Sequence, residues 1–181
     1  MWKWMMPMAA ILTGLATLSG CATAPTSAED KAALSRDVNA ALAKARAEDP
    51  SLQAFLTKAY GYAIFPTVGK GAVGVGGAYG RGEVFERGKK IGYCDLSQAT
   101  IGLALGGQTF TEIIAFENKA ALDDFKRGKL KFAAQATAVA LKAGASANAK
   151  YTDGVSVLTA NPEGLMAEAA IGGQTFSFQP L

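Results

Sequence analysis

The fold is decided by residues 61–82, which read GYAIFPTVGKGAVGVGGAYGRG and hold eight of the 21 glycines of the chain. This density of glycine is incompatible with a stable helix, because each glycine in a helix costs about 1 kcal/mol relative to alanine. The residues between the glycines include valine, isoleucine, tyrosine and phenylalanine, which favour the pleated surface of a sheet. We therefore predict glycine-rich β structure from residue 61 to residue 107, with tight turns, bulges and places where backbone or ligand approaches closely.

Two helices are predicted before this stretch. Ser27 is an expected N-cap, with Asp30 three residues later, and apolar residues then recur at helical spacing to about residue 47. Asp49 and Pro50 predict a second helix that reaches residue 58 or 59, with the aspartate as N-cap and the proline as first helical residue. We expect the first helix to pack on the domain. The alternative, that its apolar face lies on a membrane, is less favoured because that face is mostly alanine.

Strands dominate the rest of the chain. In chain order, the predicted strands cover residues 60–64, 72–79, 82–85, 90–95, 99–105, 110–116, 155–160 and 165–171. Pro66 is expected to end the first of them. The turns between paired strands are expected at residues 87–89, 106–107 and 161–164.

A short helix interrupts the strands. Asn118 is its expected N-cap, and Gly128 ends it in the manner typical of helix C-termini. Residues 131–142 favour a strand over a helix, and Asp153 with Gly154 predicts a turn. The predicted fold class is α+β: N-terminal helices followed by a glycine-rich, mostly antiparallel twisted sheet or partial barrel with one short inserted helix.

Composition limits the possible functions. Half of the 181 residues are apolar and only 18% are charged, which predicts one folded domain with a real core. The net charge of +3 is too small to indicate a nucleic-acid partner. The chain has no histidine, so it lacks the commonest general base and the commonest metal ligand. We expect no metal and no cofactor.

The first residues resemble a bacterial lipoprotein signal. Lys3 precedes an apolar run that is too short for a comfortable membrane span, and the run ends in Leu18-Ser19-Gly20-Cys21, which resembles a lipobox. The resemblance implies cleavage before Cys21 and acylation of that cysteine; the alternative is an ordinary signal with a chance cysteine. We therefore expect residues 1–20 to be a signal peptide, residues 21–27 an acylated cysteine and tether, and residues 28–181 the domain. Because Ala22 is not an aspartate, the bacterial sorting rule favours a lipid anchor in the outer membrane, facing the periplasm.

Four segments carry a resemblance to a known family. They read YGYAIFP at residues 60–66, GKG at 69–71, GVGGAYG at 74–80 and GLALGGQ at 102–108. Together they resemble the SYLF domain, over most of residues 34–178. The resemblance implies lipid and phosphoinositide binding and, in some eukaryotic members, association with actin and membrane traffic; bacterial members are typically lipoproteins. It brings no catalytic residues. In a bacterial envelope, the expected partner is an anionic phospholipid rather than a phosphoinositide.

A set of cations near the glycine-rich stretch is the candidate headgroup site. Its members are Lys70, Arg81, Arg87, Lys89 and Lys90. Backbone N–H groups exposed by glycine turns can bind anions beside such cations, although the same charges would also be found on ordinary solvated turns. Residues 69–74 formally match the dinucleotide pattern G-x-G-x-x-G, but the following residues predict a strand rather than a helix, so we expect no nucleotide site.

The sequence leaves three classes of function open. The favoured hypothesis is a non-catalytic, membrane-anchored lipoprotein that binds anionic phospholipid headgroups. The first alternative is an envelope scaffold that binds a protein partner through a sheet edge. A periplasmic hydrolase is less favoured, because no spacing pairs the candidate carboxylates Glu83, Asp95, Glu112 and Glu117. Cys94 is expected to be a small buried hydrophobic residue rather than a reactive thiol.

Overall fold

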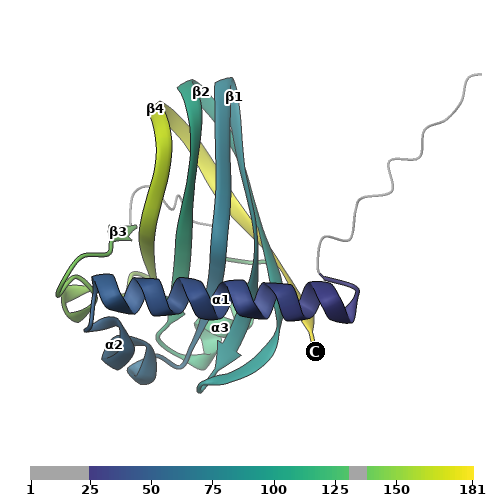
Figure 1. Cartoon of the computed structure of the whole chain (residues 1–181), viewed down its shortest axis with the longest axis vertical. Helices are drawn as coiled ribbons and strands as arrows, with labels where there is room; N and C mark the ends of the chain where they lie inside the picture. The colour runs from purple at the N-terminus through teal and green to yellow at the C-terminus, as the bar shows by residue number, and fades with distance from the viewer. Residues whose placement is uncertain (1–24, 131–137) are drawn as a thin grey trace, which may run out of the picture.

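The computed structural model describes residues 25–130 and 138–181. Its elements, in chain order, are α1 (Ala28–Glu48), α2 (Leu52–Lys58), β1 (Gly61–Glu86), β2 (Lys89–Phe116), α3 (Lys119–Lys126), β3 (Val139–Ala140), the 3-10 turn η1 (Ser146–Asn148) and β4 (Val155–Pro180). The helices at the start and the mostly antiparallel sheet that follows confirm the predicted α+β class (Figure 1). Residues 1–24, with the expected signal peptide and Cys21, and residues 131–137 lie outside the described residues. Among the residues that are described, no helix is both long and apolar enough to cross a bilayer.

The sheet has the strand order β1-β2-β4-β3. β1 and β2 form a hairpin whose turn is at Arg87 and Gly88, both with positive φ, as the sequence predicted. β4 pairs with β2 along almost its whole length, and the short β3 adds to β4 in parallel. β1 is therefore an outer strand, paired with β2 alone in the described sheet.

The predicted division into many short strands is wrong. The predicted breaks at Pro66, at Gly106-Gly107 and at residues 161–164 all lie inside continuous strands. Pro66 falls at a bulge of β1, between Phe65 and Val68, where an outer strand tolerates a missing N–H group. Gly106 has a φ of 122°, which a glycine adopts readily without ending the strand. The residues with local turn signals therefore lie at bulges and bends within longer strands and do not end them.

The three long strands fold over at mid-length, so that the sheet covers itself (Figure 1). We call the two halves the first layer (residues 61–72, 106–116 and 155–163) and the second layer (residues 77–86, 89–99 and 173–180), and the part that joins them the distal end. The two layers approach each other closely near Gly82, where a Cβ atom would lie 2.3 Å from the carbonyl oxygen of Ile64. A glycine is thus required where the two halves of β1 meet.

Side chains of the first layer alternate between two hydrophobic cores. Ala63 and Phe65 face the second layer, whereas Tyr62 and Ile64 face α1 and α2. The helix α3 closes the end of the inner core opposite to the distal end, with the ring of Phe125 5.0 Å from that of Phe116 and 5.1 Å from that of Phe176. Burial on both faces of the first layer thus explains why residues 62–65 form a continuous apolar run.

The helix ends are mostly as predicted. Ser27 accepts a hydrogen bond from the N–H of Asp30, and Asn118 accepts one from the N–H of Ala121. Gly128, with a φ of 64°, follows the end of α3. The predicted β structure of residues 131–142 is observed for Val139–Ala140 within the described part.

Asp49 is not the N-cap of α2, contrary to the prediction. Its backbone N–H ends α1 by bonding to the carbonyl of Ala45, and α2 begins three residues later, at Leu52. The buried carboxylate accepts hydrogen bonds from the N–H groups of Ser51, Gly144 and Ser146 at 3.0, 3.1 and 2.6 Å. The bonds from Gly144 and Ser146 are long-range, so sequence spacing does not reveal them, and they hold the η1 loop against the α1–α2 junction.

Candidate functional site

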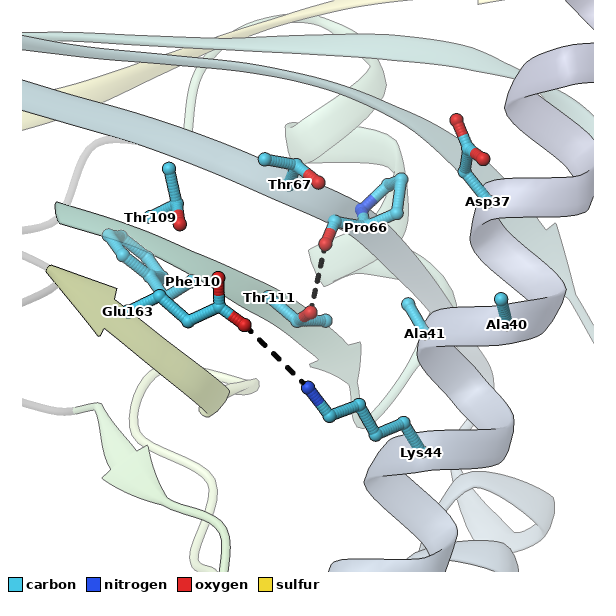
Figure 2. Close-up of a pocket in the computed structure, with 10 residues that line it drawn as sticks. All are labelled: Asp37, Ala40, Ala41, Lys44, Pro66, Thr67, Thr109, Phe110, Thr111 and Glu163. Atoms are coloured by element: carbon cyan, nitrogen blue, oxygen red, sulfur yellow. Dashed lines mark hydrogen bonds and ion pairs between the residues drawn. The ribbon is translucent and has the colours of Figure 1, made fainter.

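A groove runs along α1 where the helix crosses the first layer. Its central cavity measures about 290 Å³ and is lined by α1, by the bulges of β1 and β2, and by β4 (Figure 2). Space exists here because α1 presents the short side chains of Ala40 and Ala41 at this level, between Asp37 and Lys44. At one end of the cavity Lys44 lies 3.9 Å from Glu163, and both side chains are exposed.

The groove continues onto a glycine surface on the way to the distal end. Gly69, Gly71 and Gly107 are exposed. A Cβ atom added at Gly69 would meet nothing within 4 Å, and at the other two it would only touch carbonyl oxygens at 4.0 and 3.7 Å. Gly69 lines this region together with Lys70 on one side and with Arg81 on the other. The backbone of the outer strand β1 is thus accessible between two cations.

The structure does not bring the five predicted cations together. Lys70 and Arg81 lie on either side of Gly69, whereas Arg87 and Lys89 lie at the β1–β2 turn, at the opposite end of the strands. The predicted basic set is therefore two separate sites plus Lys90. The fold of β1 brings Lys70 near Arg81, whereas the extended strand separates Arg81 from Arg87 by about 20 Å.

Lys90 is engaged within the protein. Its Nζ lies 2.9 Å from Glu83 Oε1 and donates to the hydroxyl of Ser35 at 3.1 Å. Burial alone would lower the pKa of Lys90, but the hydrogen bond and charge of Glu83 raise it. A lysine held this way between the sheet and α1 contributes to the fold rather than to an open anion site.

Arg81 is tied to its strand but remains exposed. Its Nε donates to the hydroxyl of Tyr79 at 2.9 Å, and that hydroxyl in turn donates to Asp95 at 3.1 Å. The bond to Tyr79 raises the pKa of Arg81. The guanidinium is thus held in one place with donors left for an anion, since an arginine has five N–H donors.

Arg87 and Lys89 occupy the far turn. The guanidinium of Arg87 lies over the ring of Tyr60, 5.2 Å from its centre, and Lys89 is exposed. Nearby, the hydroxyl of Tyr60 donates to Glu86 at 2.6 Å. This turn also exposes a glycine, Gly88, but it lies at the opposite end of the strands from Gly69 and the groove along α1.

The distal end exposes large apolar side chains. Val73 is 83% exposed and Leu105 is 66% exposed, and the two are direct cross-strand partners. Residues 71–80 and 96–111 contain no charged residue, and residues 164–181 contain only Glu168. Sequence reasoning missed this feature, although the long charge-free runs could have indicated it.

A buried polar group lies between the two layers and was also missed. Glu112 Oε2 accepts a hydrogen bond from Gln174 Nε2 at 2.9 Å, and Gln98 is the cross-strand partner of Gln174. All three side chains are buried, and each keeps one polar atom without a hydrogen-bond partner among the described residues. Burial raises the pKa of Glu112 to about 7, against the opposing effects of Gln174 and Lys70.

The other candidate carboxylates are dispersed. Glu83 is paired with Lys90, Asp95 accepts from Tyr79 and Ser177, and Glu117 is exposed. Within residues 25–130 and 138–181 no cluster of three acidic, cysteine or histidine side chains is arranged to hold a metal ion. Cys94 is a buried free cysteine, as predicted, and burial together with the charges of Asp95 and Glu83 raises the pKa of its thiol well above the ordinary value.

Comparison with known proteins gives one informative relative. No protein-family model matches the chain. The chain is similar to Beta cell expansion factor A from Aeromonas veronii, with 29% identity over 153 residues. The match covers 83% of this chain but only 58% of that relative, so the chain spans little more than half of the relative's length.

Proposed function

We propose that the protein is a membrane-anchored bacterial lipoprotein of the SYLF kind whose domain binds anionic phospholipid headgroups without catalysis. The observation that supports this most is the exposed glycine surface at Gly69, on an outer strand between Lys70 and Arg81. An outer strand presents N–H groups that its single neighbour does not use. Such groups beside fixed cations suit a phosphate.

The position of the tether supports the same proposal. Pro25 is buried and lines the groove together with Gly69 and Arg81. Cys21, the proposed acylation site, precedes it by four residues, which span at most about 14 Å when extended. An acyl chain on Cys21 would therefore hold this face of the domain near the outer membrane, on its periplasmic side, where headgroups have a high effective concentration.

Vesicle sedimentation tests the headgroup site. The mature chain carrying Cys21→Ser, which has no anchor, is expected to sediment with anionic phosphatidylglycerol vesicles and not with neutral phosphatidylcholine vesicles. Lys70→Glu and Arg81→Glu should each weaken binding about fivefold or more, because a cation near an anionic surface contributes about 1 kcal/mol. The effect should shrink at high salt.

Lys89→Glu is the matched control, because it makes the same charge change at the far turn. It should change binding less than twofold. Background recovery with both kinds of vesicle would contradict the proposal, and equal losses for the three variants would contradict the location of the site.

An envelope scaffold is the second candidate, and the unpaired side of β1 favours it. A protein partner could add a strand there. Stoichiometric recovery of one envelope protein with the Cys21→Ser chain, unchanged by removal of lipid, would favour this function.

A further inference from the structure

We propose that the distal end of the folded sheet inserts into the bilayer, with Val73 and Leu105 in the acyl layer while Lys70 and Arg81 remain among the headgroups. This inference rests on the proposed function and adds how the domain is oriented on its membrane. The distal end stands clear of the helices, which cover the lower part of the first layer (Figure 1).

The first argument is the exposure of apolar side chains at one place. Val73 and Leu105 are neighbours on adjacent strands, and both are mostly exposed. Between the groove and this pair the outer face carries glycines at positions 69, 71 and 107, so no bulky side chain surrounds the pair on that side. A protein surface from which two large apolar side chains project beyond neighbouring glycines is suited to insert into the apolar part of a bilayer.

The second argument is the distribution of charge. The strand segments of the distal end are free of charge except for Glu168, and cations occur at its border, at Lys70 and Arg81. Val73 lies three positions after Lys70 along β1, so their Cα atoms are about 10 Å apart. Interfacial segments bury their apolar face about 5–10 Å below the headgroups, so this spacing matches the two layers of a membrane surface.

The third argument is the state of the backbone. The pairing of β2 with β4 continues without interruption through the distal end, where Ile101 pairs with Ile171. The pairing of β2 with β1 has a register shift there, between Val73 and Val75, so the central strand is bonded continuously on its β4 side. This lowers the cost of entering an environment without water.

The tether provides the fourth argument and favours a bilayer over a second copy of the chain. Pro25 lies beside Gly69 at the groove. From Gly69 to Val73 the strand advances about 13 Å, and the four residues from Cys21 to Pro25 reach about 14 Å. An acyl chain on Cys21 and the side chain of Val73 can therefore enter one and the same lipid layer.

Depth-dependent fluorescence quenching tests the inference on the full acylated chain. The Cys94→Ala background receives Val73→Cys or Leu105→Cys, labelled with an environment-sensitive fluorophore and reconstituted in phosphatidylglycerol vesicles. We expect a blue shift at both positions and at least twofold quenching by nitroxides on the acyl chains. Lys89→Cys, at the opposite end of the strands, is the control and should report water.

Each result decides the question. Labels at positions 73 and 105 that stay in water would overturn insertion, while anionic-vesicle binding by the Cys21→Ser chain would show that headgroup binding survives. A shift that depends on protein concentration and not on vesicles would assign the distal end to self-association and overturn the inference. Failure of the Cys21→Ser chain to bind any vesicle would remove the proposed function and the inference with it.

A paired substitution gives an independent test. Val73→Asp with Leu105→Asp should weaken sedimentation of the Cys21→Ser chain with phosphatidylglycerol vesicles at least tenfold, because one apolar side chain contributes roughly 1.5 kcal/mol or more on burial and 1.4 kcal/mol is tenfold. Gln179→Asp adds one such charge at the exposed opposite end of β4 and should have little effect. Unchanged binding by the double variant, with an unchanged circular dichroism spectrum, would contradict insertion.

Discussion

Glu112 is a carboxyl group that the fold buries at an energetic cost. It lies between the layers with one hydrogen bond, from Gln174, and its pKa is raised to about 7. Since the folded state then binds the proton more tightly than the unfolded state, the free energy of unfolding decreases as the pH rises from about 4.5 to about 7. The contribution of Glu112 to the free energy of unfolding is therefore greatest in acid and smallest above neutrality.

Replacing Glu112 with glutamine should remove this pH dependence. At pH 8, Glu112→Gln should raise the free energy of unfolding by about 3 kcal/mol, the equivalent of the pKa shift, because a neutral amide can still accept from Gln174. At pH 4, where the wild-type carboxyl is already protonated, the difference should be small. Urea unfolding of the wild type and the variant at pH 8 and pH 4 measures this difference in free energy. An equal difference at the two pH values would show that ionisation of Glu112 is not its cause.

Glycine substitutions distinguish close approach from open surface. Gly82→Ala should lower the free energy of unfolding by about 2–3 kcal/mol, because its Cβ would lie 2.3 Å from the Ile64 carbonyl oxygen and 2.9 Å from the Phe65 ring. Gly69→Ala is the matched control, with nothing within 4 Å of the new Cβ, and should change stability by no more than about 0.5 kcal/mol. Thermal unfolding of the two variants compares them directly, and similar losses would argue against the close contact of the layers.

At the scale of elements, the junction of α1, α2 and η1 depends on one carboxylate. Burial alone would raise the pKa of Asp49, but hydrogen bonds from Ser51 and Ser146 lower it below its ordinary value of 3.8. Because the pKa is lowered in the folded state, this group stabilises the fold fully at neutral pH, and its contribution is lost as the pH falls below 3.8.

Asp49→Ala should therefore destabilise the protein at pH 7 by about 3 kcal/mol, since several buried donors lose their acceptor. Amide exchange at Gly144 and Ser146 should become much faster, because their N–H groups bond to this carboxylate. Glu48→Ala, one residue earlier, is the control and should leave both amides protected. Exchange rates that stay unchanged in Asp49→Ala would contradict the role of the carboxylate.

Local signals in the sequence predicted the helices and the β1–β2 turn, but not the length of the strands. Ser27, Asn118 and Gly128 act through hydrogen bonds or φ angles within a few residues, so spacing alone reveals them. Pro66 and Gly106 also carry local turn signals. Pairing with β2 nevertheless keeps β1 continuous past Pro66, and pairing with β1 and β4 keeps β2 continuous past Gly106. Tertiary pairing thus overrode the strand ends that the local sequence predicted.

The candidate site was predicted in part for the same reason. Lys70 and Arg81 were identified as cations in a glycine-rich segment, and the structure places them on either side of Gly69. Arg87, Lys89 and Lys90 were grouped with them by proximity in sequence, but an extended strand advances about 3.3 Å per residue and carries these residues away from Arg81. The contact of Gln174 with Glu112 spans 62 residues, and no local pattern indicates it.

At the scale of the whole molecule, the proposed anchor would decide where the domain acts. If Cys21 is acylated as we propose, Cys21→Ser should block processing of the precursor and deplete the protein from the outer-membrane fraction. An inhibitor of the lipoprotein signal peptidase should make the wild-type precursor accumulate in the same way. Immunoblots of fractionated cells measure both effects. Normal processing and fractionation in either experiment would contradict the anchor.

The order of the strands also has a consequence for biogenesis. β2 is complete at Phe116, but its second neighbour, β4, begins only at Val155. In a chain translocated amino end first, the backbone N–H and C=O groups of β2 that pair with β4 would thus lack partners until the last residues have been translocated. If the protein is exported as we propose, its export should depend on periplasmic holdases, and truncation before residue 155 should turn the chain into an aggregate or a protease substrate rather than a smaller domain.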